Sequence, residues 1–502
     1  MAIKFGTSGW RDIIAQGFTF GGVRTVGQAI AELVKKERLH NRPVIVGYDT
    51  RFLSENFARE ISAILSGNGI EVHLSSRDVP TPVLAFEVIR SKAAGAVNIT
   101  ASHNPWDYSG VKFSTAWGGP ALPATTATIE ETCRAIEAGE IPVRRPKDAV
   151  LAGRLVQSID PRPAYLKYVK GLLDVKAIKK AGLSVVVDSL YGTGRDYVDT
   201  LLEECGCKVT VLHNWRDVLF GGTGPDPSPH NLKDLFAKVQ SSHAKLGLAT
   251  DGDADRFGIV DADGSFISPN DFLALLVYHL HVTRGWNGVV ARSVMTTHFI
   301  DAVAKKYGLI TQETPVGFKY IGEIMVKENA VYPAKNGNFL LGGEESGGFT
   351  MRGHVPEKDG ILACLLAVEM VAVHGKPLKK IMADLQKETG AFLSERFNYA
   401  TDPVTVQNLK EKLSKNFPTQ LAGIQVRRIV DIDGHKFVMT DGSWIGLRSS
   451  GTEPLIRVYV EASDPKRLAA LAQAGRDLIE SCRPPKSKKP SVKAKKAVSR
   501  VR

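Results

Sequence analysis

The chain has 502 residues, of which 43% are hydrophobic and 24% charged, and it carries a net charge of +12 at pH 7. Because one hydrophobic core stops growing at roughly 250 to 300 residues, this length predicts several domains. The composition is that of a globular protein and excludes a chain kept unfolded by an excess of polar residues.

Membrane and secretory segments are not indicated. No uninterrupted apolar run approaches the roughly 20 residues of a membrane span, and residues 1–11 lack the pattern of a secretory signal. A cytoplasmic protein without a membrane partner is therefore expected. The five cysteines are scattered, and Cys205 with Cys207 alone is poor zinc spacing, so reduced structural cysteines are predicted.

Most of the positive charge lies at the C-terminal end. Residues 483–502 hold nine Lys or Arg and no acidic residue. Such a run cannot build a packed core, so a disordered basic tail is expected, either solvated or in contact with something acidic. Nucleic acid is not the expected partner, because no aromatic-interleaved basic surface or known binding motif accompanies the tail.

Short β-branched runs recur along the chain, and each ends in a turn rich in Gly, Ser or Asp before a helical pattern begins. The runs are Val44–Val46, Ala93–Thr100, Ser184–Val187, Leu246–Thr250, Val289–Ala291 and Phe339–Leu341. Strands that alternate with helices predict α/β layers, with functional loops at the carboxyl ends of the strands.

These units predict three similar α/β domains with mixed sheets, at 1–150, 160–260 and 261–390. The first break, near 142–160, is polar and contains proline. Residues 394–482 differ and predict a smaller α+β domain, followed by the tail at 483–502. Its expected helices are Gln407–Leu413 and Arg467–Ile479, and its expected antiparallel strands are Ile424–Asp431, Lys436–Thr440 and Leu455–Glu461.

The first candidate loop, Thr100-Ala101-Ser102-His103-Asn104-Pro105, follows the second of these runs. Proline fixes the exit of the chain, so such a turn can hold the Ser102 hydroxyl in a cleft. A serine at a strand end is also an ordinary turn residue. No G-x-S-x-G elbow surrounds it, which argues against a Ser-His-Asp hydrolase.

Asp251, Asp253 and Asp255 stand at alternate positions after the run Leu246–Thr250. Side chains two apart in an extended loop can converge on one hard cation, which prefers oxygen ligands. An EF-hand needs Glu where Ala262 stands, so that calcium loop is excluded, and a solvated acidic turn remains the alternative. Three carboxylates plus ligands from outside the protein suit Mg²⁺.

Two later turns suit a phosphosugar. The glycine-rich stretch 342–348 contains Glu344 and Ser346, whose carboxylate and hydroxyl are partners for neighbouring sugar hydroxyls. In residues 448–454, Arg448 stands beside hydroxyl side chains and a glycine. Such a turn can direct several hydrogen-bond donors toward a dianion such as a phosphate. A plain tight turn fits the same residues. No G-x-x-x-x-G-K-[ST] occurs, so an ATP-type phosphate cradle has no support.

Together the four loops resemble the α-D-phosphohexomutase superfamily. The match runs in the right order from Gly6-Thr7-Ser8-Gly9-Trp10-Arg11 to residues 448–454, nearly the whole chain before the tail. The resemblance implies four domains around a central cleft. It also implies phosphoryl transfer between the 1- and 6-positions of a hexose phosphate, through a phosphoserine, a 1,6-bisphosphate and one Mg²⁺ per chain.

The resemblance further implies roles for single residues. Ser102 would be the phosphoserine, and Mg²⁺ would be held by its phosphate together with Asp251, Asp253 and Asp255. Lys112 would be the general base. Arg11, His103 and Arg256 would face the reacting groups. Substrate binding would fall to Lys319, Glu344, Ser346, Arg448, Ser450, Gly451 and Thr452.

The sugar loop favours glucose. Mannose and glucosamine branches of the superfamily often end this loop in His, where the present chain has Gly348. Conversion of glucose 1-phosphate to glucose 6-phosphate is therefore predicted. A phosphomannomutase or dual-specificity mutase is the alternative, followed by a phosphopentomutase or a bisphosphosugar synthase. The sequence leaves the oligomeric state open.

Overall fold

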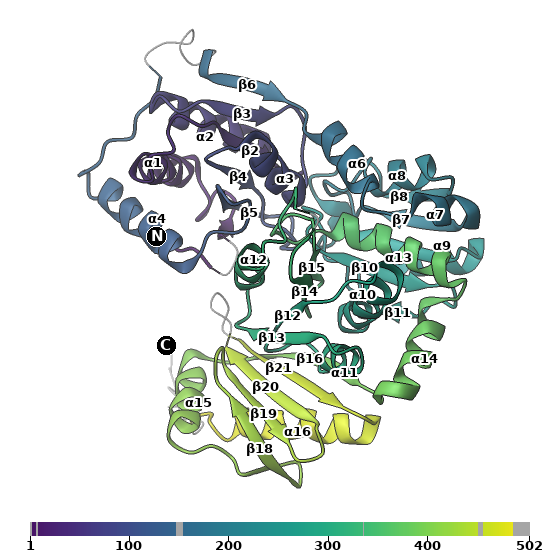
Figure 1. Cartoon of the computed structure of the whole chain (residues 1–502). Coiled ribbons are helices and arrows are strands. Elements are labelled where there is room, and N and C mark those ends of the chain that lie inside the picture. Colours follow the sequence, from purple (N-terminus) through teal and green to yellow (C-terminus); the bar gives the residue numbers. More distant parts are fainter. Residues whose placement is uncertain (1–2, 7–8, 147–153, 335, 450–454, 485–502) are drawn as a thin grey trace, which may run out of the picture. The chain divides into compact units, whose positions relative to one another are not determined.

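The computed structural model describes residues 3–6, 9–146, 154–334, 336–449 and 455–484. The chain divides into two compact units, residues 1–394 and 395–502. The first unit holds three α/β domains, each with its own sheet, and the second holds an antiparallel sheet with helices (Figure 1). The predicted fold classes, α/β for the first three domains and α+β for the last, are confirmed.

The first domain is built on a six-stranded sheet with the order β1-β5-β4-β2-β3-β6. The strands are β1 (Trp10–Ile13), β2 (Val44–Tyr48), β3 (Val72–Ser75), β4 (Gly95–Ile99), β5 (Tyr108–Thr115) and β6 (Val156–Ile159). Strands β4, β2, β3 and β6 are parallel, and β1 with β5 forms an antiparallel edge. Strand β6 lies in the stretch 142–160, which the sequence analysis predicted as a break between domains. The exposed polar residues of this strand resemble those of a linker, which explains the prediction.

Helices cover both faces of this sheet. Successive side chains of β2 point to opposite faces, and each face packs against its own helices. Val44 and Val46 pack in one core with α1 (Phe20–Lys36), α2 (Ser54–Gly67) and α4 (Pro123–Glu137). Ile45 packs in another core with α3 (Thr81–Ser91). The carboxyl ends of β2 and β4 lie side by side, so the loop that carries Ser102 adjoins the loop after β2.

The second domain has a five-stranded sheet with the order β11-β10-β9-β7-β8. Its strands are β7 (Ser184–Asp188), β8 (Lys208–Leu212), β9 (Leu246–Thr250), β10 (Phe257–Asp261) and β11 (Phe266–Ile267). Its helices are α6 (Arg162–Lys170), α7 (Val175–Ala181), α8 (Val198–Glu204) and α9 (Lys233–Ser242), with a 3₁₀ turn at Phe220–Gly222. Strands β9 and β10 pair as a hairpin, so the acidic loop 251–256 is held at both ends.

The third domain has a four-stranded sheet with the order β13-β12-β14-β15. Its strands are β12 (Val289–Ser293), β13 (Ile310–Thr314), β14 (Phe339–Glu344) and β15 (Gly348–Met351), and its helices are α10 (Pro269–Arg284), α11 (Phe299–Lys306), α12 (Phe318–Lys327), α13 (Gly360–His374) and α14 (Leu378–Thr389). Strands β14 and β15 form a hairpin with Glu344 opposite Gly348, so the glycine-rich loop is its turn.

Helix α13 joins the second and third domains. Its residues 360–371 are buried on every side, and it packs against β9, β10 and α7 of the second domain (Figure 1). Its leucines belong to one continuous core that extends from α3 through the second domain to α14. No single helix of the described residues is long and apolar enough to cross a membrane; α13 with α14, bent by 75°, meets that test only as a pair.

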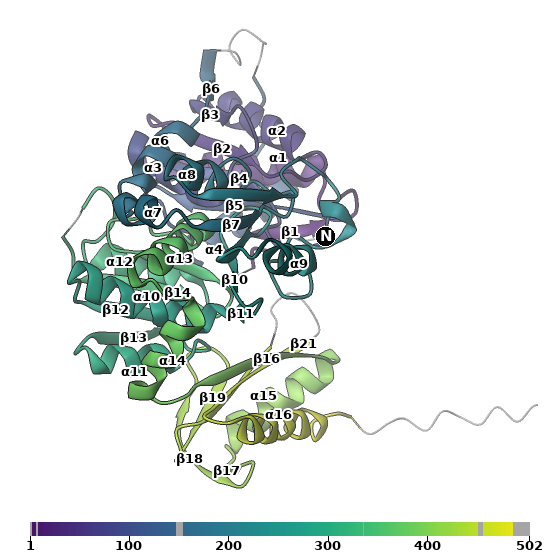
Figure 2. The ribbon, with the colours of Figure 1, turned by 90° about the vertical axis from the view of Figure 1, so that its right-hand side faces the viewer.

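The second unit is an antiparallel sheet with the order β16-β21-β20-β19-β18-β17. Its strands are β16 (Leu393–Ala400), β17 (Gln420–Leu421), β18 (Ile424–Val430), β19 (His435–Met439), β20 (Trp444–Ser449) and β21 (Leu455–Ala462), and its helices are α15 (Pro403–Lys415) and α16 (Pro465–Glu480). Both helices share one core with the strands and cover the same face of the sheet (Figure 2). This unit therefore has a hydrophobic core of its own.

Candidate active site

Ser102 stands just beyond the carboxyl end of β4 and is almost completely buried. Its φ of +52° lies in the left-handed region, where a residue other than glycine is strained. Its backbone N–H donates to Thr100 Oγ1 at 2.9 Å, and its Oγ donates to Asp251 Oδ2 at 2.7 Å. The fold therefore brings the predicted serine to the predicted metal loop of the next domain.

The acidic loop 251–256 lies where the three domains meet. Thr81 of the first domain donates its backbone N–H to Asp253 O at 3.0 Å, and Gly360 of the third donates to Ala254 O at 3.1 Å. Gly252 approaches the nucleophile loop so closely that a Cβ there would lie 2.7 Å from Ser102 O. The loop is thus fixed by backbone contacts from three directions.

The three carboxylates of this loop converge. Asp251, Asp253 and Asp255 are buried, and each offers an oxygen within 4.8 Å of the others. Lys112 Nζ lies 2.5 Å from Asp253 Oδ2 and 2.7 Å from Asp255 Oδ2. Lys358 Nζ lies 2.8 Å from Asp255 Oδ2. Two lysines therefore share the negative charge of the triad.

Further cations border the nucleophile loop. Arg11 Nη1 donates to Asn104 Oδ1 at 2.7 Å, and Arg256 Nε lies 3.9 Å from Asp255 Oδ1. Burial, with the nearby charges of Arg256 and Arg11, holds the pKa of His103 well below its ordinary value. The surroundings of His103 therefore disfavour its charged form, and positive charge beside Ser102 comes from arginine and lysine.

Glu344, at the end of β14, is buried in the sugar-type loop. Its Oε1 accepts the backbone N–H of Gly317 at 2.7 Å, which joins this loop to the start of α12, where Lys319 lies. Burial, and then the charge of Glu345, raise the pKa of Glu344 to about 7. Glu345 itself accepts from Ser293 Oγ at 2.8 Å, so it fastens the loop to β12.

The sugar-type loop also adjoins the metal loop. A Cβ at Gly347 would lie 3.3 Å from Phe257 O, and a Cβ at Gly348 would lie 2.6 Å from Lys358 Cδ. Ser346 is half-buried in the turn between these positions and the strand. Lys319 is buried, with its Nζ 5.5 Å from the Tyr320 ring centroid.

The predicted anion loop belongs to the second unit. Arg448 lies at the end of β20, and its Nε is 3.0 Å from both carboxylate oxygens of Asp433. Ser450, Gly451 and Thr452 lie outside the described residues, as do Thr7 and Ser8 of the N-terminal motif.

Comparison with known proteins places this geometry in a family. Four domain models of the phosphoglucomutase/phosphomannomutase family match consecutive parts of the chain: alpha/beta/alpha domain I at 2–140, domain II at 163–264, domain III at 268–389 and the C-terminal domain at 404–478. The chain belongs to this family. The resemblance predicted from the four loops is confirmed, and the chain is a phosphohexomutase-family enzyme, an isomerase.

Relatives named for different activities are about equally similar. A phosphoglucomutase/phosphomannomutase of Thermococcus kodakarensis is 30% identical, over 96% of this chain and 99% of the relative. A probable phosphoglucosamine mutase of Methanobrevibacter smithii is also 30% identical, over 94% and 98%. The crystal structure of a putative phosphomannomutase from Thermus thermophilus has 32% identity and a TM-score of 0.81, over 96% and 99%.

The residues of the acidic loop fit a magnesium ion. Asp253 Oδ1 and Asp255 Oδ1 are buried and have no hydrogen-bond partner among the described residues. An unpartnered buried carboxylate oxygen is costly, and a hard cation satisfies it. Burial, then the charges of Asp253 and Asp255, raise the pKa of Asp251, so ionising all three carboxylates together calls for further positive charge. The three aspartates can hold the ion as this family implies.

Two cations of the site were missed by the sequence analysis. Lys358 touches Asp255, and Arg51, in the loop after β2, bonds to the backbone of the nucleophile loop. Each lies within two residues of an aspartate in the sequence, in Asp49-Thr50-Arg51 and in Lys358-Asp359. Polar residues directly after the buried strand β2 were a usable signal for Arg51, whereas nothing in the local pattern singles out Lys358.

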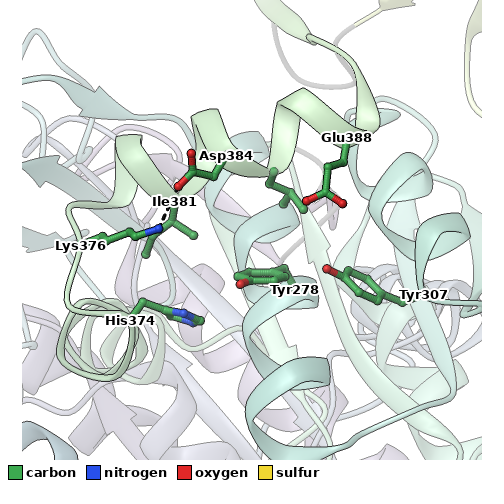
Figure 3. Close-up of a pocket in the computed structure, with 8 residues that line it drawn as sticks. Tyr278, Tyr307, His374, Lys376, Ile381, Asp384 and Glu388 are labelled. Atoms are coloured by element: carbon green, nitrogen blue, oxygen red, sulfur yellow. Dashed lines mark hydrogen bonds and ion pairs between the residues drawn. The ribbon is translucent and has the colours of Figure 1, made fainter.

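A surface pocket on the third domain is separate from this site (Figure 3). It is lined by Tyr278, Tyr307, His374, Lys376, Ile381, Asp384, Leu385 and Glu388. Lys376 Nζ lies 3.0 Å from Asp384 Oδ2 at its edge. None of the predicted site residues that the structure describes lines it, so the three-domain junction is the candidate active site.

Proposed function

We propose that the chain is a Mg²⁺-dependent mutase that interconverts glucose 1-phosphate and glucose 6-phosphate through phospho-Ser102. The observation that carries this proposal is the 2.7 Å hydrogen bond from Ser102 Oγ to Asp251 in the buried junction. It puts the Ser102 hydroxyl beside a trio of carboxylates that suits a metal ion. A phosphoryl group on Ser102 would therefore lie next to the ion.

The reaction would proceed in two balanced halves. In the first, the bond from Ser102 Oγ to phosphorus breaks while the free hydroxyl oxygen of a hexose monophosphate bonds to phosphorus, which gives a hexose 1,6-bisphosphate. In the second, the bisphosphate has turned end for end, the bond from its other sugar oxygen to phosphorus breaks, and Ser102 Oγ bonds to that phosphorus, which releases the isomeric hexose monophosphate. Mg²⁺ held by Asp251, Asp253 and Asp255 would neutralise charge on the group in transfer.

Protons move through Lys112 in this proposal. In the first half Lys112 Nζ takes the proton of the attacking sugar hydroxyl, and Ser102 Oγ gains a proton as it leaves phosphorus. In the second half Ser102 Oγ gives up its proton as it attacks, and Lys112 Nζ returns a proton to the departing sugar oxygen. Lys112 Nζ lies 2.5 Å from Asp253 Oδ2 and 2.7 Å from Asp255 Oδ2, so this proposed proton acceptor stands beside the metal loop. Arg11 and Arg256 would balance charge on the phosphate oxygens.

Sugar hydroxyls would bind to Glu344 and Ser346, with Lys319 beside them, and Arg448, Ser450, Gly451 and Thr452 would hold the phosphate that is not reacting. The buried carboxyl of Glu344 suits a hydroxyl partner, because a buried polar group needs a hydrogen bond. Gly348 supports glucose over mannose or glucosamine. A larger residue there would displace Lys358, whose stem crosses the loop at this point.

The test is an assay of glucose 1-phosphate, mannose 1-phosphate and glucosamine 1-phosphate, each with Mg²⁺ and a trace of the matching bisphosphate. We expect the highest kcat/KM for glucose 1-phosphate. A higher value for glucosamine 1-phosphate would favour the second candidate, which the name of the Methanobrevibacter smithii relative supports. Ribose 1-phosphate in the same assay tests a phosphopentomutase.

A further inference from the structure

Arg51, in the loop after β2, is a charged side chain with a hydrogen-bond partner for every donor. Its side chain is fully buried, and all five guanidinium N–H donors have acceptors. Nε donates to Asp49 Oδ2 at 2.9 Å, and Nη1 donates to Pro105 O at 2.5 Å and Tyr108 O at 3.0 Å. Nη2 donates to Ser102 O and Asn104 O, each at 2.7 Å. Four of the five acceptors are backbone carbonyls of residues 102–108.

The anchor of Arg51 is itself rigid. Asp49 Oδ1 accepts the backbone N–H of Arg51 at 3.0 Å and the hydroxyl of Ser54 at 2.8 Å. Phe220 of the second domain covers the guanidinium, with its ring centroid 5.0 Å from Cζ. A buried cation with one carboxylate partner, a full set of carbonyls and an aromatic cover has a single arrangement. Arg51 therefore acts as a fixed point between the loops after β2 and β4.

We propose that Arg51 is the positioning residue of phosphoryl transfer: it holds residues 102–108 so that Ser102 stays in its left-handed conformation with Oγ facing the metal loop. Strained backbone persists only where the surroundings over-determine it. Ser102 O accepts directly from Arg51, and the carbonyls of Asn104, Pro105 and Tyr108 fix the rest of the turn. Arg51 bonds to no atom of the metal triad, so it acts through the nucleophile loop.

Lysine cannot replace this arginine. An ammonium is a point charge with three donors, whereas the planar guanidinium reaches four carbonyls and a carboxylate from fixed directions. Arg51→Lys keeps the charge and most of the volume but releases part of the loop. Because a misplacement of 1 Å can slow a reaction about 100-fold, we expect a loss of about that size in the transfer step.

The experiment compares the wild type with Arg51→Lys and with Arg352→Lys as a matched control. Arg352 also donates to backbone carbonyls, those of Phe339 and Asn287, beside an aromatic ring, Trp286, but it lies in the third domain away from Ser102. Transfer from phospho-Ser102 to glucose 6-phosphate is followed in a single turnover by intact mass. Hydrogen exchange of residues 102–108 and the steady-state KM complete the comparison.

We expect Arg51→Lys to slow the single turnover about 100-fold while the KM for glucose 1-phosphate stays within about twofold. Exchange of amides 102–108 should become faster in this variant alone, and Arg352→Lys should match the wild type in all three measurements. Transfer within threefold of the wild type, or a loss no larger than the fraction of unfolded protein, would overturn the proposal.

If Arg51→Lys does not fold, Asp49→Asn gives the same test, because it keeps the guanidinium and weakens only its anchor. The expected signature is the same, with a smaller loss of transfer rate. The inference rests on the proposed function through phospho-Ser102, and the two fail separately. A wild-type chain that takes no phosphate from glucose 1,6-bisphosphate would refute the phosphoserine, whereas unchanged exchange of residues 102–108 in Arg51→Lys would refute the positioning role alone.

Discussion

Ser102 is held by hydrogen bonds to side chains of two different domains. Its carbonyl accepts from Arg51 within the first domain, and its hydroxyl donates to Asp251 of the second. At the scale of single residues the site is therefore a set of side chains whose partners are distant in the sequence. Each of them gives a variant with a distinct expected effect.

Ser102→Ala removes the only proposed carrier of the phosphoryl group. We expect steady turnover to fall by at least about 1,000-fold, a barrier increase of about 4 kcal/mol. Turnover of glucose 1-phosphate and the mass of the chain after treatment with bisphosphate measure this effect. Ser109→Ala is the matched control, because Ser109 is a buried serine of the same domain whose hydroxyl has no partner among the described residues. Near-normal turnover in Ser102→Ala would refute the assignment.

Asp253→Asn tests the metal loop. The change removes the charge of a proposed ligand but keeps an oxygen. Because changing an outer-shell partner of a metal ligand already costs roughly 10- to 100-fold in affinity, we expect Mn²⁺ affinity, measured by calorimetry, to fall at least roughly 10-fold. The Mg²⁺ concentration needed for half-maximal turnover should rise in parallel. Asp263→Asn, an exposed aspartate in the turn between β10 and β11, should leave both titrations unchanged. Equal titrations for the wild type and Asp253→Asn would contradict the site.

Glu344 gives a pH dependence with a definite sign. Burial raises its pKa from 4.5 to about 7, so between these values the folded chain keeps a proton that the unfolded chain has lost. Stability of the ligand-free chain therefore falls as pH rises through this window, by up to about 3 kcal/mol from this group. Glu344→Gln removes the effect. We expect the variant to gain stability over the wild type at pH 8 but not at pH 4, in chemical unfolding; an equal difference at both values would count against it.

At the scale of elements, the sequence located strands better than helix starts. The runs beginning at Val44, Ser184 and Val289 begin strands at those residues, because buried parallel strands are β-branched throughout. Helix α15 was predicted from Gln407 but begins at Pro403, after Asp402 as its N-cap. Aspartate before proline is a helix-start signal that periodicity alone does not detect.

Arg51 and Lys358 show why the sequence did not predict every residue of the site. Arg51 and Asn104 are 53 residues apart in the chain, and their contact depends on β2 and β4 being neighbours in the sheet. Ser102, Asp253 and Glu344 could be named beforehand because each stands in a loop of unusual composition after a buried strand. Lys358 has no such local signal, and Arg51 has only the polar residues that directly follow β2.

Helix α13 belongs to the packing of two domains at once. Leu366 is fully buried in the core that the second and third domains share. We expect Leu366→Ala to destabilise the first unit by about 2 to 5 kcal/mol, through lost contacts and a cavity. Val373→Ala in the same helix, at a side chain 39% exposed, should have little effect. A shift in the unfolding midpoint no larger for Leu366 than for Val373 would show that the core repacks freely.

At the scale of the whole molecule, the chain has separate cores in its two units. One core, which includes Leu366, runs through the three α/β domains, and another, which includes the fully buried Leu471, lies within the second unit. We therefore expect calorimetry to show two thermal transitions. Leu471→Ala should lower only one of them and Leu366→Ala only the other. A single transition lowered by both variants would mean that the units unfold together.

The contact between Gly348 and Lys358 restricts how the sugar loop can change over evolutionary time. Any side chain at position 348 meets the stem of Lys358, whose amine binds Asp255. Replacement of Gly348 by histidine in the course of evolution must therefore follow or accompany a substitution at position 358. In homologous sequences the two positions should covary, and a histidine introduced at 348 should be tolerated only together with a shorter residue at 358.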